Sequence, residues 1–159
     1  MEKIQNYEEA EKLWSSAVGE FIIAFTQIEQ LLHLVIEKYL SETLIENEHL
    51  ADGLENRIKL MKLILKIKVT EEKFTELEKL CQNIMRLKDI RNLLAHNSIV
   101  LMIDKSSAGE IRIGEYEVAS LKNKQKSIKY AKLIKETEVL KDSIKKIAEI
   151  ITNSKSKKL

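Results

Sequence analysis

The chain lacks proline altogether and has only four glycines and one cysteine among its 159 residues. Proline and glycine are the residues that most often end or interrupt a helix, so their scarcity favours long helices. One cysteine excludes an internal disulfide and suits a reducing compartment, and no cysteine–histidine spacing suggests zinc. We therefore expect a helical protein that needs no metal or other cofactor, in which Cys81 is a small buried apolar residue.

Long apolar runs are also missing. The longest, such as FIIAF at 21–25, are far shorter than the stretch of about 20 residues that crosses a membrane. The first residues, MEKIQNYEEAEKLW, lack the apolar centre of a secretory signal. With 44% hydrophobic and 33% charged residues, the composition is typical of a globular protein. These features predict a cytoplasmic protein that makes no membrane contact, with one domain over residues 1–152 and a frayed basic tail at 153–159.

Apolar residues recur at helical spacing in four segments. These segments are 7–40, 54–69, 71–95 and 125–152. In the first, apolar residues from Trp14 to Tyr39 recur at alternating steps of four and three, which makes a sustained stripe for bundle packing. Thr70 followed by Glu71 and Glu72 is typical of a helix N-terminus, because a threonine hydroxyl caps the first turn and acids suit the helix dipole there.

The pattern changes between the third and the fourth helical segment. Residues 98–104, SIVLMID, are β-branched and apolar, and residues 110–118, EIRIGEYEV, alternate over their first half. KSSAG between them supplies a turn, so the region is typical of a β-hairpin. The alternation slips at Gly114, where we expect a β-bulge. The predicted fold class is mainly all-α: a bundle of four to five helices with a short β-hairpin inserted before the last helix.

Charge is unevenly distributed along the chain. Residues 1–56 hold 12 acidic and 3 basic residues, whereas the remainder holds 13 acidic and 24 basic ones. The densest basic stretch, 122–135, has six lysines and no acid. Such a stretch attracts phosphate backbones. The candidate RNA-binding residues are Lys122, Lys124, Lys126, Lys129 and Lys132. The alternative is a solvated, lysine-rich helix start.

Arg91 interrupts the apolar stripe of the third helical segment. The stripe consists of Leu77, Leu80, Ile84, Leu87 and Leu94. Arg91 occupies the position between the last two at which the spacing calls for an apolar residue. An unpaired buried charge is costly, so Arg91 should have a partner or face a shared cleft. Glu29, beside the stripe of the first helix, is a candidate partner, and a solvent-facing Glu29 is an equal alternative.

A polar line accompanies Arg91. Asp89, Asn92 and His96 follow one another at steps of three and four, about one residue's rotation away from the Arg91 line. Arg91 and His96 are separated by about 140° on an ideal helix and are not stacked. The arginine is long, however, and His96 stands where the helix is expected to end, so both side chains can reach one groove beside the helix terminus.

The run Arg91-Asn92-Leu93-Leu94-Ala95-His96 resembles the R-x4-6-H signature of HEPN domains, in which a polar residue commonly follows the arginine. The order of segments is similar to that family too, with a long first helix containing FTQIEQLL, a motif that closes the third helix, and a late helix that packs back. The resemblance implies a helical domain that dimerises with its two motifs facing each other. In many members the paired motifs form a metal-independent RNA endonuclease site. Arg91 and His96 would then be the catalytic pair and Asn92 the supporting polar residue.

The resemblance also implies partners. Some members are toxins with a cognate antitoxin, and some carry a tyrosine two positions after the histidine that a nucleotidyltransferase modifies. The corresponding residue here is Ser98, which places that form of control in doubt. Other members are non-catalytic and bind nucleotides or partner proteins. A non-catalytic dimerisation module that binds a partner protein, nucleotide or nucleic acid is therefore the alternative function.

The chemistry of RNA cleavage fits these residue types. RNA supplies its own nucleophile, the 2′-hydroxyl, so no metal-bound water is needed. Histidine can donate or accept a proton near neutral pH, and arginine offers a permanent forked charge to phosphate oxygens. One chain has one Arg91 and one His96, and a two-fold homodimer would supply two of each. The expected products end in a 2′,3′-cyclic phosphate and a 5′-hydroxyl. The opposing interpretation is that Arg91 belongs to a structural ion-pair network and that His96 is a helix C-terminal residue favoured by the dipole.

Overall fold

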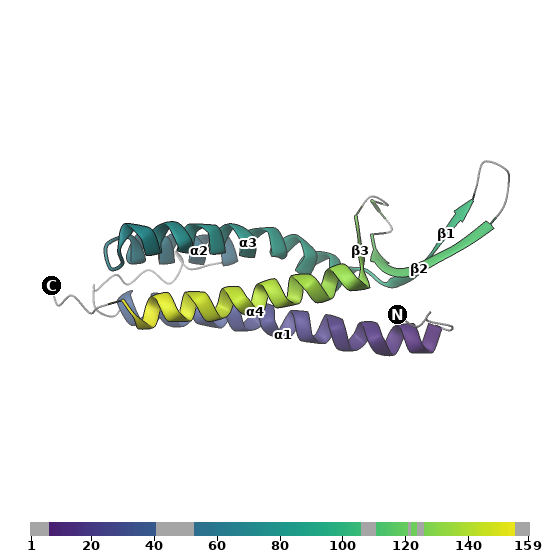
Figure 1. Cartoon of the computed structure of the whole chain (residues 1–159), viewed down its shortest axis with the longest axis horizontal. Helices are drawn as coiled ribbons and strands as arrows, with labels where there is room; N and C mark the ends of the chain where they lie inside the picture. Colours follow the sequence, from purple (N-terminus) through teal and green to yellow (C-terminus); the bar gives the residue numbers. More distant parts are fainter. Residues whose placement is uncertain (1–6, 41–52, 106–110, 121, 124–125, 155–159) are drawn as a thin grey trace. The chain divides into compact units, whose positions relative to one another are not determined.

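The computed structural model describes residues 7–40, 53–105, 111–120, 122–123 and 126–154. Within them are helices α1 (Tyr7–Leu40), α2 (Gly53–Lys66), α3 (Glu71–His96) and α4 (Tyr130–Thr152). Strands β1 (Ile99–Lys105), β2 (Ile111–Ala119) and β3 (Ser127–Lys129) lie between α3 and α4 (Figure 1). The mainly-α prediction, with a small antiparallel element before the last helix, is confirmed. Residues 106–109 of the expected turn and most of the basic tail fall outside the described residues.

The ends of the helices follow local chemistry. Thr70 precedes α3, and its hydroxyl accepts a hydrogen bond from the backbone N–H of Lys73 at 3.5 Å, which agrees with the predicted N-cap. Gly53 opens α2 with a φ of 77°, a conformation that other residues rarely adopt. The second helix ends at Lys66, three residues earlier than predicted. Its last turn closes through the Lys68 and Val69 N–H groups, which both donate to the Leu65 carbonyl at 3.0 Å.

The hairpin prediction needs a correction, because a third strand joins it. The order in the sheet is β1-β2-β3, and β3 pairs antiparallel with β2 from Glu117↔Lys129 to Ala119↔Ser127. The fourth helix therefore begins at Tyr130 and not near Gln125. A three-residue strand is too short for its period of two to be distinguished from a helix start in the sequence. In the fold, Ile128 is buried between partly exposed Ser127 and exposed Lys129.

The predicted bulge falls where expected. Leu101 pairs with Tyr116 and Ile103 with Ile113, so β2 has one more residue than β1 between these two pairs. The extra residue lies in the short segment of β2 that contains Gly114. A bulge bends and twists a strand locally, and this one separates the distal half of the hairpin from the half that β3 joins.

The chain forms two compact units. The first consists of Met1–Ile23 and Lys88–Glu138, and the second of Ala24–Leu87 and Val139–Leu159. In the first unit, Trp14 is fully buried and packs edge-on against Tyr130 at 5.5 Å between ring centroids. In the second, all four helices supply core residues. The fully buried members there include Ile28, Leu32, Met61, Leu65, Leu77, Ile84, Leu87 and Leu140.

One helix also satisfies a membrane criterion. By length and composition, Tyr7–Tyr39 would be able to cross a membrane, and core helices of soluble proteins pass the same test. Trp14 and Phe21 in the first unit, and Ile28 and Leu32 in the second, are fully buried. These positions of the apolar stripe of α1 are used for internal packing.

Candidate functional site

The last two turns of α3 carry polar residues on one side and core residues on the other. Leu94 is buried, whereas Asp89, Asn92 and His96 line a pocket of about 640 Å³. Asp89 and His96 are exposed and Asn92 is partly buried. The spacing of three and four residues therefore brings all three side chains to one pocket, as the predicted polar line requires.

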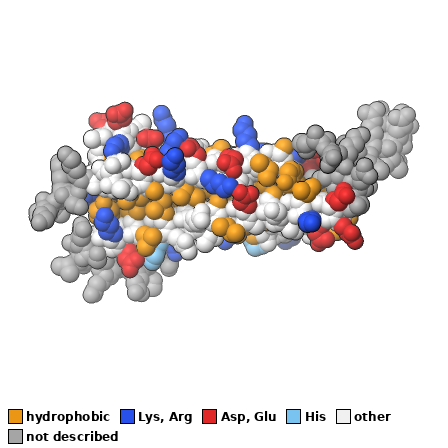
Figure 2. Space-filling view, turned by 60° about the horizontal axis from the view of Figure 1, so that its bottom comes forward, with side chains coloured by type: hydrophobic (Ala, Val, Ile, Leu, Met, Phe, Trp, Pro, Cys, Tyr) orange, Lys and Arg blue, Asp and Glu red, His pale blue; other side chains and the backbone are white. Residues whose placement is uncertain are grey.

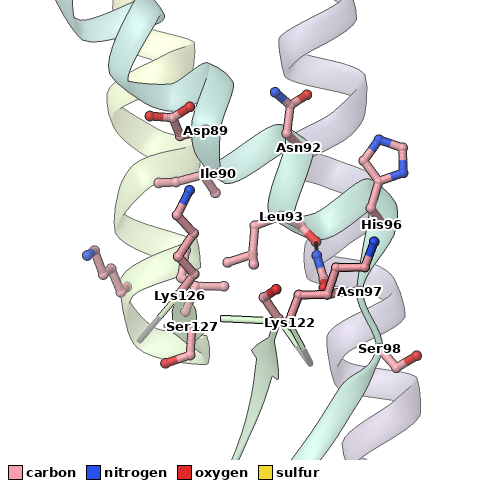
Figure 3. A pocket seen from close by; sticks show the side chains of 13 residues that line it. Asp89, Ile90, Asn92, Leu93, His96, Asn97, Ser98, Lys122, Lys126 and Ser127 are labelled. Atoms are coloured by element: carbon pink, nitrogen blue, oxygen red, sulfur yellow. Dashed lines mark hydrogen bonds between the residues drawn. The ribbon is translucent and has the colours of Figure 1, made fainter. Parts of the chain in front are cut away.

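A second wall of this pocket comes from a distant part of the sequence. It consists of Ser120, Lys122 and Lys126 from the β2–β3 connection, Ser127 and Ile128 from β3, and Lys132 from the first turn of α4. Every residue that lines the pocket belongs to the first unit. Figure 3 shows Lys126 extending toward Asp89 and Ile90, and Lys122 extending toward Asn97 near the end of α3.

We call the wall formed by residues 120–132 the lysine wall, and local hydrogen bonds connect several of its residues. The Ser120 N–H donates to the Lys126 carbonyl at 2.9 Å, and the Lys126 N–H donates to the Asn123 carbonyl at 2.8 Å. The Asn123 N–H in turn donates to the Ser120 hydroxyl at 3.3 Å. These bonds tie Ser120, Asn123 and Lys126 to one another, and Lys122 and Lys126 line the same pocket. The pairing of β2 with β3 holds the flanking residues Ala119 and Ser127 together.

The end of α3 is fixed by Asn97. Its side-chain amide donates to the Leu93 carbonyl at 2.8 Å, which satisfies one of the carbonyl groups left free at a helix C-terminus. The bond is drawn in Figure 3. It secures the turn after His96, whose imidazole lies in the last turn of the helix. Asn97 was not a predicted site residue, and its place directly after the motif was the only indication in the sequence.

Arg91 occupies a different position from the other two motif residues. Its side chain is half-buried, is absent from the residues that line the pocket, and donates from Nη1 to Asn92 Oδ1 at 3.3 Å. Among the described residues of its own unit, no carboxylate forms an ion pair with it. Glu29 belongs to the other unit, so its partnership with Arg91 stays a prediction. The structure thus links Arg91 to the pocket through Asn92.

Three of the five candidate lysines line the pocket. Lys122, Lys126 and Lys132 do so, whereas Lys129 lies 3.9 Å from the Glu117 carboxylate, measured from Nζ to Oε1, and is not among the lining residues. Lys124 lies outside the described residues. Lys122 and Lys126 lie in the β2–β3 connection and Lys132 in the first turn of α4, whereas Lys129 is the last residue of β3 and pairs with Glu117 of β2. The sequence analysis expected a helix from residue 125, which would include Lys126, Lys129 and Lys132, and gave no reason to separate Lys129 from the other two.

Several lining residues were not predicted. Ser120, Ser127 and Ile128 join the site only because β3 pairs with β2, and no local pattern marks them. Ile90 and Leu93 lie between the polar residues of α3, and both line the pocket. Asp89 belonged to the predicted polar line but was given no role. Asp89 is more than 30 residues from the lysines in the sequence, so the sequence did not indicate that they share a pocket.

The site offers a proton carrier, three ammonium groups, amide donors and one carboxylate around an apolar centre. Lysine clusters bind phosphate oxygens, and a histidine can transfer protons near neutral pH. Over the described ranges, no group of three His, Cys, Asp or Glu side chains is placed to hold a metal ion. Comparisons with protein-family models, curated proteins and solved structures produced no match. Function is therefore inferred from the residues and the geometry of this pocket.

Proposed function

We propose that the protein is a metal-independent RNA endonuclease of the HEPN type, acting in the cytoplasm. The observation that supports this best is that His96 and Asn92, from the R-x4-6-H motif, share one pocket with Lys122, Lys126 and Lys132. Motif and basic stretch were separate features of the sequence, about 25 to 40 residues apart. Their meeting places a group able to transfer protons beside groups able to hold a phosphate.

In this mechanism the lysines hold the phosphate that is to be cleaved. Their ammonium groups attract its oxygens and stabilise the charge that grows on the phosphorane in the transition state. His96 accepts the proton of the 2′-hydroxyl or donates a proton to the departing 5′ oxygen. The 2′ oxygen forms the new bond to phosphorus while the bond to the 5′ oxygen breaks. The products are a 2′,3′-cyclic phosphate and a 5′-hydroxyl.

A homodimer completes the proposal. Both proton transfers in one step need an acid and a base, and each chain has one His96. A two-fold axis that passes close to the pocket would bring a second His96 and a second Arg91 to the same phosphate. In that arrangement Arg91, which donates a hydrogen bond to Asn92, contributes positive charge to the phosphate. A cognate antitoxin or a modifying nucleotidyltransferase would be a natural partner of such an enzyme.

The test is cleavage of labelled single-stranded RNA in EDTA. We expect His96→Ala to lower the cleavage rate by at least about 100-fold, the low end of what general acid–base catalysis contributes. His33→Ala is the matched control, since His33 is an exposed histidine of α1 in the other unit and the change should leave the rate unaltered. Products should carry cyclic phosphate ends.

Two results would refute the mechanism. One is cleavage that requires added Mg²⁺ and leaves a 5′-phosphate. The other is full activity in His96→Ala. Analytical ultracentrifugation of both variants separates loss of chemistry from loss of the dimer.

A non-catalytic role has one specific observation in its favour. Arg91, the first residue of the motif, does not line the pocket of the single chain. A module that only binds RNA or a nucleotide needs the lysines but not a pair of Arg91 and His96 residues. RNA binding that persists without any cleavage, and that survives Arg91→Ala and His96→Ala, would favour this alternative.

A further inference from the structure

The pocket is bipolar, because one wall carries a carboxylate and the other carries three ammonium groups. Asp89 is exposed on α3 and forms no ion pair with any described residue of its unit. Lys122, Lys126 and Lys132 belong to the opposite wall; Lys126 extends toward Asp89, whereas Lys122 lies by Asn97, toward the His96 end of α3 (Figure 3). A site built for phosphate alone would gain nothing from a carboxylate, which repels phosphate oxygens. The arrangement suits a ligand with an anionic group at one end and hydrogen-bond donors at the other.

The centre of the pocket is apolar. Ile90, Leu93 and Ile128 line it, and Figure 3 shows Leu93 pointing from α3 into the space between the walls. Aliphatic side chains of this kind offer a flat, dry contact for an aromatic ring. A nucleotide has an anionic phosphate, a planar base and polar base edges, so it matches the lysines, the apolar centre and Asp89 in turn.

The hydrogen-bonding groups of the four bases indicate which base Asp89 would bind. A carboxylate only accepts hydrogen bonds, so it requires neighbouring N–H groups. Guanine presents N1–H and N2–H side by side on its Watson–Crick edge, and both can bond to the two oxygens of one carboxylate. Adenine and cytosine pair one amino group with an acceptor on that edge. Uracil has one N–H between two carbonyl oxygens, which a carboxylate repels.

We propose that Asp89 is the base-specifying residue of this pocket and that it selects guanine in single-stranded RNA; this inference rests on the proposed role of the site in binding RNA. Asp89 and His96 are seven residues apart on α3, which separates their Cα atoms by about 10 Å along the helix axis. The base held by Asp89 is therefore at the far end of the pocket from the proton-transferring imidazole. The guanosine that carries this base lies next to the cleaved phosphate in the RNA, and its binding positions that phosphate.

The test measures binding without cleavage. Four 2′-O-methyl oligonucleotides, each a uridine pentamer with G, A, C or U at the centre, lack the 2′ nucleophile and so stay intact. Fluorescence anisotropy of the wild-type protein should show the G oligonucleotide binding at least about tenfold more tightly than the U oligonucleotide, as expected for a bidentate contact. The preference should fall to within about twofold in Asp89→Asn, because the amide NH₂ faces a guanine donor. The ratio is compared and not the absolute affinity, since removal of a negative charge strengthens phosphate binding to every oligonucleotide.

Glu115→Gln is the matched control. Glu115 is an exposed acid of β2 in the same unit and does not line the pocket, so this variant should keep the wild-type preference. Equal affinity for the four oligonucleotides, no binding at all, or a G preference that Asp89→Asn retains would each overturn the inference. A G preference that depends on Asp89 in a protein that never cleaves RNA would uphold it and refute the nuclease. Cleavage without any base preference would support the nuclease and overturn the role of Asp89.

Discussion

At the scale of single residues, adjacent positions of the motif have different surroundings. Arg91 and Asn92 follow each other in the chain, yet only Asn92 lines the pocket, because successive side chains on a helix are about 100° apart. The 3.3 Å bond from Arg91 Nη1 uses the Asn92 Oδ1 oxygen. The Nδ2 group, a donor only, is then the end of the amide that remains for an anionic ligand. All three residues of the expected polar line border the pocket, whereas Arg91 is not among its lining residues, so a groove shared by Arg91 and His96 stays a prediction.

Cys81 illustrates a residue whose surroundings suppress its chemistry. Burial raises the pKa of its thiol from 9.0 to about 11; Lys62 lowers this pKa and Glu78 raises it, both by smaller amounts. The prediction that Cys81 is a buried apolar residue is confirmed. Since the thiolate is the reactive form, we expect iodoacetamide at pH 8 to label the native protein far more slowly than the denatured protein. Mass spectrometry of timed samples measures both rates.

The same pKa shift has a consequence for stability. The unfolded chain ionises its thiol near pH 9.0, while the folded thiol stays protonated to about pH 11. The contribution of Cys81 to folding is therefore complete below pH 9 and is lost as the pH rises toward 11.

In the iodoacetamide experiment, native labelling as fast as that of the denatured protein at pH 8 would contradict the burial of this thiol.

At the scale of elements, α3 has two tasks. Its apolar stripe, Leu77, Leu80, Ile84, Leu87 and Leu94, is buried as predicted, and its last two turns present the polar residues of the pocket. Because both faces follow the regular spacing of a helix, the sequence predicted the apolar face and the polar face correctly. The sheet was less predictable, because strand β3 is defined by its pairing with β2 and not by its own residues. Because β3 pairs with β2, α4 begins at Tyr130, later than predicted, and Lys126 and Lys132 line the pocket.

The start of α3 provides a test at this scale. Thr70→Ala removes the hydroxyl that accepts the Lys73 N–H. Because the bond is long and exposed, we expect a loss of about 0.5–1 kcal/mol in the free energy of unfolding, the lower part of the range for N-caps. Urea denaturation followed by circular dichroism measures the change. Thr70→Ser keeps a hydroxyl and should lose less, and an unchanged midpoint in Thr70→Ala would show that the cap contributes nothing.

At the scale of the whole molecule, the acidic and basic parts of the sequence are mixed by folding. Each compact unit combines residues from the acidic first third with residues from the basic remainder. The face shown in Figure 2 accordingly carries both acidic and basic side chains. General attraction to nucleic acid is therefore weakened over that surface. The lysines around the pocket should dominate whatever RNA binding the chain has.

Salt dependence tests this expectation. For single-stranded RNA, removing one ammonium group that neutralises a phosphate should reduce the slope of log K against log[salt] by about 0.7. Lys132→Ala should show this reduction and bind more weakly. Lys135→Ala, at an exposed position of α4 outside the pocket, is the control and should behave like the wild type. Equal slopes in all three proteins would remove the lysine wall from the proposed interface.

The sequence by itself determined the presence of the four helices, the bulged hairpin and the polar line of α3, because each depends on contacts between residues close in the chain. Tyr7–Leu40 was delimited correctly from its periodicity alone, and the cap at Thr70 from one side chain. Only the tertiary structure decided that β3 exists, that Lys129 turns to Glu117 while Lys126 faces the pocket, and that Asp89 opposes three lysines. These facts depend on strand pairing between residues whose local patterns are ambiguous, and such pairing is settled by long-range packing.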